Sequence, residues 1–325
     1  MPSRPVADDV PRHRPVMLAE VLAALAPRHD GIYVDGTFGG GGYTRAILDT
    51  AATRVFAIDR DPDAIAAGAG LAAEVEGRLV LLEGPFSHMK ELLASHDIDS
   101  VDGIVLDIGV SSMQLGDAER GFSFMADGPL DMRMSREGPT AADIVNDYAP
   151  AELARIISRY GEERRARVIA RAIERARQEA PITRTLQLVA LIERVMGRPR
   201  PDMIHPATRT FQALRIYVND ELGELERALE ASESLLNPGG RLVVVAFHSL
   251  EDRIVKRFLT ERSGRAGRPS RHAPMVGSAP EPTFEPITKG ALRPGQSECD
   301  ANPRARSARL RAARRTGAPA RSGAI

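Results

Sequence analysis

The sequence predicts a doubly wound α/β domain that is interrupted by an inserted helical subdomain. Short, continuous apolar runs alternate with helical stretches through the first third of the chain. Runs that are apolar at every position are typical of parallel strands covered on both faces of a sheet. A long stretch with helical patterning then separates the fourth apolar run from the fifth. These three observations lead to the fold class.

The strands and the helices between them follow one another in a regular order. The strands expected from continuous apolar runs are Gly31–Asp35, Arg54–Asp59, Arg78–Gly84, Asp102–Val110 and Arg241–Phe247. The helices expected between the first four strands begin with Tyr43–Asp49 and continue with Pro62–Glu76 and Phe86–His96. Two last strands are expected within Phe284–Leu292 and Ser307–Arg315. Alternating strands and helices of this kind build a parallel sheet.

The gap before the fifth strand is too long for a single crossover connection. It holds 130 residues (111–240), whereas one βαβ unit uses about 30. Leucines at helical spacing predict one crossover helix over Thr208–Leu236, which Asn237-Pro-Gly-Gly240 would end. The expected helices in the rest of the gap are Ala151–Tyr160, Glu162–Glu179 and Thr185–Met196. We therefore expect an α/β domain from residues 1–114 and 206–325, and a helical, substrate-recognising insert at 115–205.

Composition excludes several classes of protein. Lys and Arg number 44, as do Asp and Glu, so the overall charge identifies no partner. Cys299 is the only cysteine, which excludes an internal disulfide framework and a cysteine-built metal site, and we expect no metal. No apolar run approaches the roughly 18 residues of a membrane helix, and the first residues lack the apolar region of a secretory signal. These observations predict a cytoplasmic protein that has no membrane partner.

The segment VDGTFGGGGYTRAI (Val34–Ile47) predicts a ligand-binding turn between the first strand and the first helix. No lysine follows the glycines, which excludes a P-loop, and the third glycine of a dinucleotide fingerprint would fall on Thr44 or Arg45. Asp59 ends the second strand, where a carboxylate can bond ribose hydroxyls. This combination favours a nucleoside cofactor without phosphates, such as S-adenosylmethionine. The alternative is a tight turn that binds nothing.

Phe38-x-Gly40-x-Gly42 resembles the first motif of amino-group methyltransferases. The chain as a whole resembles the RsmH (MraW) family, the bacterial 16S rRNA cytosine-N4 methyltransferases. The segments that carry this resemblance, besides the glycine run, include His13–Leu22, Ala57–Ile65, Gly84–Ser87, Gly103–Met134, Tyr160–Ile173, His205–Leu222, Pro238–Phe258 and Asn302–Ala313. The resemblance implies a Rossmann-like class I fold and S-adenosylmethionine as the cofactor. It also implies a target cytosine in the decoding region of 16S rRNA, within the 30S subunit.

The resemblance also implies which residues contact the cofactor. They are Gly41, Gly42, Tyr43, Asp59, Phe86, Asp107 and Gln114. Tyr43 departs from the family, which often has histidine there, so a contact from its side chain is open. Phe86 follows the third strand and is expected either to pack on the adenine or to be a core residue. Asp107 closes the fourth strand at the edge where open α/β sheets bind ligands, or else caps a loop.

Asp107-Ile108-Gly109-Val110 is similar in position to the Asp-Pro-Pro-Tyr motif of amino methyltransferases, which makes Asp107 the candidate catalytic residue. The exocyclic amine of cytosine is a weak nucleophile because its lone pair is delocalised into the ring. The Asp107 carboxylate and the Ile108 carbonyl would accept its hydrogens, and such acceptors contribute on the order of 10²–10⁴-fold. Val110 stands where the motif has a stacking aromatic residue, so Phe122 or Phe124 is expected to stack on the base or to lie in the core.

Basic residues near the fifth strand and the C-terminus are candidates for RNA contact. His248, after the fifth strand, is expected to contact the substrate, to act as a base or to have a structural role. Arg253, Lys256 and Arg257 are expected to bind phosphates, as are the arginines at 262–271 and the C-terminal arginines, part of which would alternatively form a solvated tail. Asp131 and Arg133 are expected to pair. The remaining alternatives are methylation of DNA or protein, a non-catalytic rRNA-binding assembly factor, and either a monomer or a homodimer.

Overall fold

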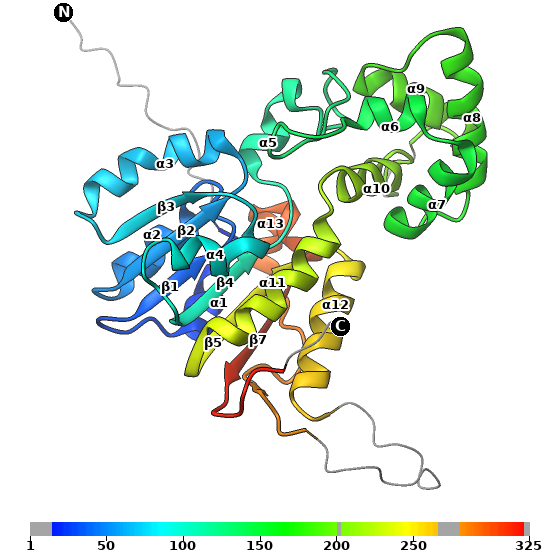
Figure 1. The fold of residues 1–325 in the computed structure, drawn as a ribbon. Helices are drawn as coiled ribbons and strands as arrows, with labels where there is room; N and C mark the ends of the chain where they lie inside the picture. Colours follow the sequence, from blue (N-terminus) through cyan, green and yellow to red (C-terminus); the bar gives the residue numbers. More distant parts are fainter. Residues whose placement is uncertain (1–14, 200–202, 266–279, 322–325) are drawn as a thin grey trace, which may run out of the picture.

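A seven-stranded sheet organises the α/β part of the chain, and a lobe of helices projects from it (Figure 1). The computed structural model describes residues 15–199, 203–265 and 280–321. Residues 266–271 of the predicted phosphate-binding arginines lie outside this range. None of the described helices has the length and apolar character needed to cross a membrane.

The strand order of the sheet is β3-β2-β1-β4-β5-β7-β6. The strands are β1 (Ile32–Asp35), β2 (Arg54–Asp59), β3 (Leu79–Glu83), β4 (Val101–Asp107), β5 (Leu236–Ala246), β6 (Phe284–Pro286) and β7 (Arg309–Arg315). The first five are parallel, whereas β7 runs antiparallel to both β5 and β6. The predicted α/β fold class is confirmed, and so are the two C-terminal strands. The order reverses between β1 and β4, which is where open α/β sheets bind ligands.

Helices cover both faces of the sheet because successive strand residues point to opposite sides. Tyr33, Val55 and Val105 point to one face and pack under α1 (Leu18–Leu25), α2 (Gly42–Thr50) and α3 (Pro62–Glu74). The next residue of each strand, in turn Val34, Phe56 and Leu106, points to the other face. That face lies under α4 (Met89–Ala94), α11 (Glu221–Leu235) and α12 (Ser249–Arg262). This double cover explains why the strands are apolar at every position.

The prediction of one crossover helix over Thr208–Leu236 is wrong, because the chain forms two helices there. α10 (Thr208–Val218) and α11 are separated by Asn219 and Asp220, and Asp220 adopts the left-handed conformation with φ 46°. The buried Asn219 side chain donates to the Met132 carbonyl at 2.7 Å and accepts from the Met134 amide at 2.9 Å. These bonds fix the break against the helical lobe.

The helical lobe has a hydrophobic core of its own. Its elements, green in Figure 1, are α6 (Ala141–Asp147), α7 (Pro150–Gly161), α8 (Ala166–Glu179), α9 (Thr185–Met196) and α10; α5 (Ser112–Gly116) and a 3₁₀ turn at Ala118–Arg120 lead into it. Ile144, Ile157 and Ile169 share this core with Phe211 and Leu214 of α10. Because α10 packs here and not on the sheet, we propose that the insert extends beyond His205 to Val218.

Candidate active site

The glycine run forms the turn from β1 into α2. Gly41 caps α2 with φ 75°, a conformation that a side chain would strain, and its amide donates to the Phe38 carbonyl at 2.7 Å. A Cβ on Gly42 would lie 2.2 Å from Pro15 Cγ, so this position has no room for a side chain. A Cβ on Gly40 would meet no atom within 4 Å. The turn is therefore packed on one side and open at Gly40.

Two carboxylates hold this turn in place. Asp59 at the end of β2 accepts from the Gly39 amide at 2.8 Å and from the Asp61 amide at 2.9 Å. Burial raises the pKa of Asp59. Asp35 at the end of β1 is fully buried and accepts from the Thr44 hydroxyl at 2.7 Å and the Thr37 amide at 3.2 Å. Burial raises the pKa of Asp35 to about 6. Asp35 thus ties both ends of the turn together, a role the sequence prediction missed.

Asp107 lies beside the turn, at the end of β4, with an unsatisfied carboxylate oxygen. Its amide donates to the Thr37 hydroxyl at 2.7 Å, which joins β4 to the glycine turn. Within the described part of the chain, its Oδ1 atom is buried and has no hydrogen-bond partner. Burial, with the charges of Asp35 and Glu251, holds the pKa of Asp107 well above its usual range. A buried acceptor without a partner is costly, so this one is suited to a donor that a ligand brings.

Three more residues are predicted to contact the cofactor, namely Tyr43, Phe86 and Gln114. They differ in burial and in their hydrogen-bond partners. The Tyr43 ring is buried and its hydroxyl donates to the Val16 carbonyl, so its polar atom is occupied within the protein. Phe86 is half-buried, with its Cβ next to Gly36 of the glycine turn. The buried Gln114 accepts from the Ser111 amide at 3.0 Å and donates to Asp61 at 2.8 Å.

Asp61, the acceptor of the Gln114 side chain, lines a pocket of about 210 Å³ that the sequence did not reveal as a unit. Asp61, Ser111 and Arg120 are among the residues that line it. Arg120 donates to Asp61 at 2.9 Å, so α3 and the start of the insert meet at this carboxylate. The residues come from positions far apart in the chain, and no local motif marks them.

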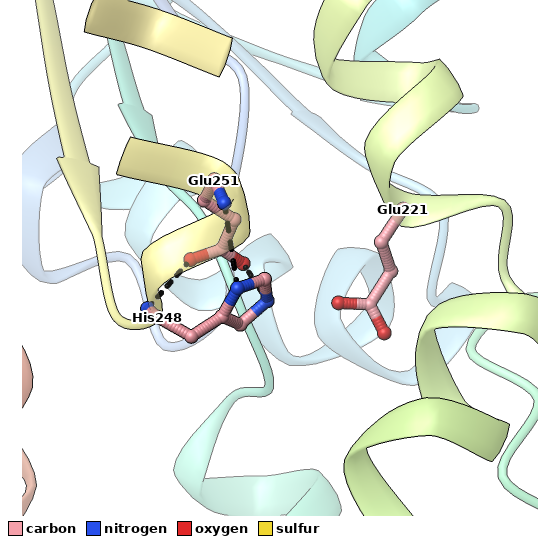
Figure 2. Close-up of side chains that lie close together, drawn as sticks. All are labelled: Glu221, His248 and Glu251. Carbon is pink, nitrogen blue, oxygen red and sulfur yellow. Dashed lines mark hydrogen bonds and ion pairs between the residues drawn. The ribbon is translucent and has the colours of Figure 1, made fainter. Parts of the chain in front are cut away.

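On the other side of Asp107, the half-buried His248 and the buried Glu251 form a pair at the start of α12 (Figure 2). Glu251 accepts from the amides of Phe247 at 2.8 Å and His248 at 3.1 Å. His248 Nδ1 accepts from the Glu251 amide at 3.4 Å. The His248 Nε2 atom lies 2.9 Å from Glu251 Oε1, but the two are misaligned and neither makes a hydrogen bond within the described residues.

Glu221 completes a group that has the spacing of a metal site. One ligand atom each from Glu221, His248 and Glu251 lie within 4.8 Å of one another. However, the two carboxylate oxygens of Glu221 already accept from Arg215 at 2.7 and 2.8 Å. A metal ion would have to displace this guanidinium, so we interpret the group as an ion-pair network between α10, α11 and α12.

Several predicted RNA-contact arginines are paired within the protein. Arg253 binds Glu162 of the insert at 3.1 Å, and Arg257 binds Glu226 at 2.6 Å. The pairings of the C-terminal arginines are Arg309 and Arg311 with Asp252, Arg314 with Glu285, and Arg315 with the Glu233 and Thr283 carbonyls. Lys256 is exposed and has no partner in the described part of the chain. Pairing therefore lowers the number of cations that are available to an RNA.

The two phenylalanines expected near the base differ in their surroundings. Phe122 lies in the core of the insert and is only 5% exposed. Phe124 stacks on His205 with 4.9 Å between ring centroids and meets Phe211 edge-on at 5.6 Å. Phe124 is therefore the more accessible of the two rings.

The predicted ion pair of Asp131 and Arg133 is confirmed, with contacts of 2.8 and 2.7 Å.

Comparisons with known proteins place this site in a family context. A family model described as the MraW methylase family matches residues 11–316. The ribosomal RNA small subunit methyltransferase H of Parvibaculum lavamentivorans is 62% identical over 95% of this chain and 91% of its own length. The protein of the same name from Xanthobacter autotrophicus is 61% identical over 96% and 90%. An rRNA methylase structure from Streptococcus thermophilus aligns with 94% of this chain and 98% of its own, at 10% identity and a TM-score of 0.42.

Proposed function

Because the chain belongs to the MraW methylase family, we propose that it methylates the exocyclic N4 amine of a cytosine in small-subunit ribosomal RNA. The methyl donor is S-adenosylmethionine, and the fold is the Rossmann-like methyltransferase fold. We propose the decoding region of 16S rRNA, within the 30S subunit in the cytoplasm, as the place of the reaction. The observation that carries the proposal is the buried Asp107 oxygen without a partner, at the edge of the sheet beside the glycine turn.

The residues around the glycine turn fit the cofactor. The first amides of α2 point out of the helix end, as needed for a carboxylate of the methionine part, and Gly40 borders open space. Each Asp59 oxygen accepts one amide and keeps a lone pair for a ribose hydroxyl. We propose that Gly41, Gly42, Asp59 and Phe86 contact the cofactor directly. Gln114 and the amide of Tyr43 complete the site.

The chemistry of the transfer depends on orienting a poor nucleophile. S-adenosylmethionine supplies an electrophilic methyl group on a sulfonium sulfur. Asp107 accepts a hydrogen of the cytosine amine, which turns the nitrogen lone pair out of conjugation with the ring. The buried Asp107 Oδ1 atom has no partner within the described residues and is therefore available to accept this hydrogen. The Ile108 carbonyl offers a second acceptor.

The helical insert is suited to a part in RNA recognition, and two ion pairs link it to the sheet domain. Arg253 of α12 binds Glu162 of the insert, while Arg215 of the insert binds Glu221 of α11. These contacts hold the insert next to α12, which follows β5, the strand whose Val245 pairs with Asp107 (Figure 1). We propose that the RNA is held between the two parts.

The proposal is tested with labelled S-adenosylmethionine and three acceptors from a strain that lacks the enzyme. These acceptors are 30S subunits, naked 16S RNA and DNA. We expect label in ribosomal RNA, on a cytosine identified by nucleoside mass spectrometry. Asp107→Ala should reduce the rate by about 10² or more, while Asp99→Ala, an exposed residue before the same strand, should not. Label in DNA alone, or in none of the three, would refute the proposal.

A further inference from the structure

A second pocket, of about 200 Å³, lies beyond the end of β5 on the far side of Asp107 from the glycine turn. The residues that matter for its chemistry are His248, Ser249, Arg293, Arg306, Ser307 and Arg309. We call it the β5–β7 pocket. No carboxylate is among its lining residues, and three of them are arginines. Its composition therefore suits an anion.

The antiparallel strand β7 explains why these residues meet. Parallel strands end at the edge where the active site lies, but β7 begins there, and Ala246 of β5 pairs with Arg309 of β7. The 3₁₀ turn Pro303–Ser307 enters β7 and therefore lies next to His248, where α12 starts. Residues about 60 positions apart in the chain thus line one pocket, as a consequence of topology.

The arginines of this pocket differ in how far they are neutralised. Arg309 lies 3.0 Å from Asp252, but Asp252 also binds Arg311 at 2.7 Å and so serves two guanidinium groups. Arg293 and Arg306 are exposed, and among the described residues neither has an ion pair or a hydrogen bond. The predicted RNA contacts Arg253 and Arg257, in contrast, are each paired with a glutamate. Arg293 and Arg306 are therefore free to bind a phosphate bidentately.

The position of the pocket favours binding of the RNA acceptor over binding of the methyl donor. Asp107 pairs with Val245 of β5, and Val245 pairs with Leu310 of β7. Two strand spacings, about 10 Å, thus separate Asp107 from Leu310, the residue that follows the lining residue Arg309. The glycine turn lies on the opposite side, after β1. Along this edge of the sheet the order is cofactor turn, Asp107, His248 and then the β5–β7 pocket.

We propose that the β5–β7 pocket binds a backbone phosphodiester of the RNA next to the methylated nucleotide, chiefly through Arg293 and Arg306. This inference rests on the proposed function. An enzyme that works on a base has to take it out of its stack, and contacts with the flanking backbone hold the strand while the base reaches the catalytic residue. Ser249 and Ser307 also line the pocket, but their hydroxyls already donate to Glu162 and to the Arg304 carbonyl, so the two arginines carry the proposed contact.

The test compares the double variant Arg293→Ala/Arg306→Ala with Arg314→Ala. Arg314 is also an exposed arginine, lies in β7 and is paired with Glu285, and it does not line the pocket. On 30S subunits, we expect the double variant to raise KM about 10- to 100-fold, as for loss of charged hydrogen bonds, with kcat within about twofold. Affinity for 16S RNA falls with salt, and the slope of log affinity against log salt concentration measures this dependence. In the double variant this slope should be less steep by about one for each phosphate that is no longer neutralised. Arg314→Ala should match the wild type.

Further measurements separate this role from general effects. In the double variant, the dissociation constant of S-adenosylmethionine and the melting temperature should match those of the wild type. Arg293→Ala/Arg306→Lys, which keeps the charge at position 306, should have part of the affinity for 16S RNA that the double alanine variant loses. An equal loss in Arg314→Ala would show a nonspecific charge effect and overturn the proposal. Weakened cofactor binding in the double variant would assign the pocket to the cofactor and also overturn it.

The inference and the proposed function fail in different ways. A wild-type protein that methylates no ribosomal RNA would refute the function. Binding of 16S RNA, measured by filter retention without turnover, would still test the pocket. A double variant that binds and methylates RNA like the wild type would refute the pocket alone.

Discussion

At the scale of single residues, Asp107, the proposed catalytic residue, lies in an unfavourable environment for a charge. Its carboxylate is buried, one oxygen has no partner within the described residues, and Asp35 and Glu251 add negative charge nearby. The pKa of Asp107 is therefore higher in the folded than in the unfolded chain. A group of this kind stabilises the fold most at pH values below its unfolded pKa. That contribution is lost as the pH rises through the folded pKa, because a buried charge must then be accommodated.

We expect Asp107→Asn to inactivate the enzyme and to stabilise it. The amide is neutral, so at pH 8 the melting temperature of the variant should exceed that of the wild type, and the difference should shrink towards pH 5. Methyl transfer should fall by about 10² or more. Thermal melts at both pH values, with Asp99→Asn as the exposed control, check this. A lower melting temperature at pH 8 would mean that the charged Asp107 stabilises the fold.

Individual site residues differ in how far the sequence predicts them. The positions of Asp59 and Asp107 at one edge of the sheet were predictable because each ends a strand, and the carboxyl ends of parallel strands meet at one edge. The role of Asp61 was not, because Gln114 and Arg120 reach it from more than 50 positions away. The pairing of Arg253 with Glu162 also depends on how the insert folds back onto α12.

At the scale of elements, the glycine turn contains two neighbouring glycines, of which only Gly41 is constrained in its backbone conformation and its surroundings. Gly41 has φ 75°, and a Cβ there would lie 3.0 Å from the Phe38 ring. We expect Gly41→Ala to cost about 1–2 kcal/mol from the left-handed backbone alone. Gly40 has neither constraint. Gly40→Ala should leave the free energy of unfolding unchanged within about 0.5 kcal/mol.

The Gly40→Ala variant also tests where the cofactor binds. If the cofactor lies against Gly40, the added methyl group should weaken its binding without affecting stability. Calorimetric titration with S-adenosylmethionine, alongside denaturant unfolding, gives both quantities. Unchanged cofactor affinity in Gly40→Ala would place the ligand elsewhere.

The break between α10 and α11 shows what helical periodicity omits. Leu214 faces the core of the insert, whereas Leu225 and Leu229 face the sheet, yet all three fit one helical pattern. The break depends on Asn219, whose side chain bonds Met132 and Met134 far away in the sequence. Local spacing therefore predicts the helical residues but not where one helix ends.

At the scale of the whole molecule, Arg215 and Glu221 join the insert to the sheet domain. Removing one partner leaves a buried charge without compensation, which costs about 3–5 kcal/mol. We expect Arg215→Met to destabilise the protein by about this amount, because Glu221 and Glu251 then face each other without the cation. Urea unfolding measures the loss. Arg215→Met/Glu221→Met should recover much of it, and Arg314→Ala, from an exposed pair, should cost no more than about 1 kcal/mol.

The placement of the insert also bears on how the chain folds. β4 and β5 are hydrogen-bonded neighbours in the middle of the sheet, yet residues 108–235 lie between them. Closing a flexible loop costs entropy that rises by about 0.6 kcal/mol with each doubling of its length. The insert has its own core, and so it can order itself first and bring Leu106 and Val244 within reach of each other. If the lobe acts as a folding nucleus in this way, a weakened insert core should slow refolding of the sheet, which stopped-flow refolding measures.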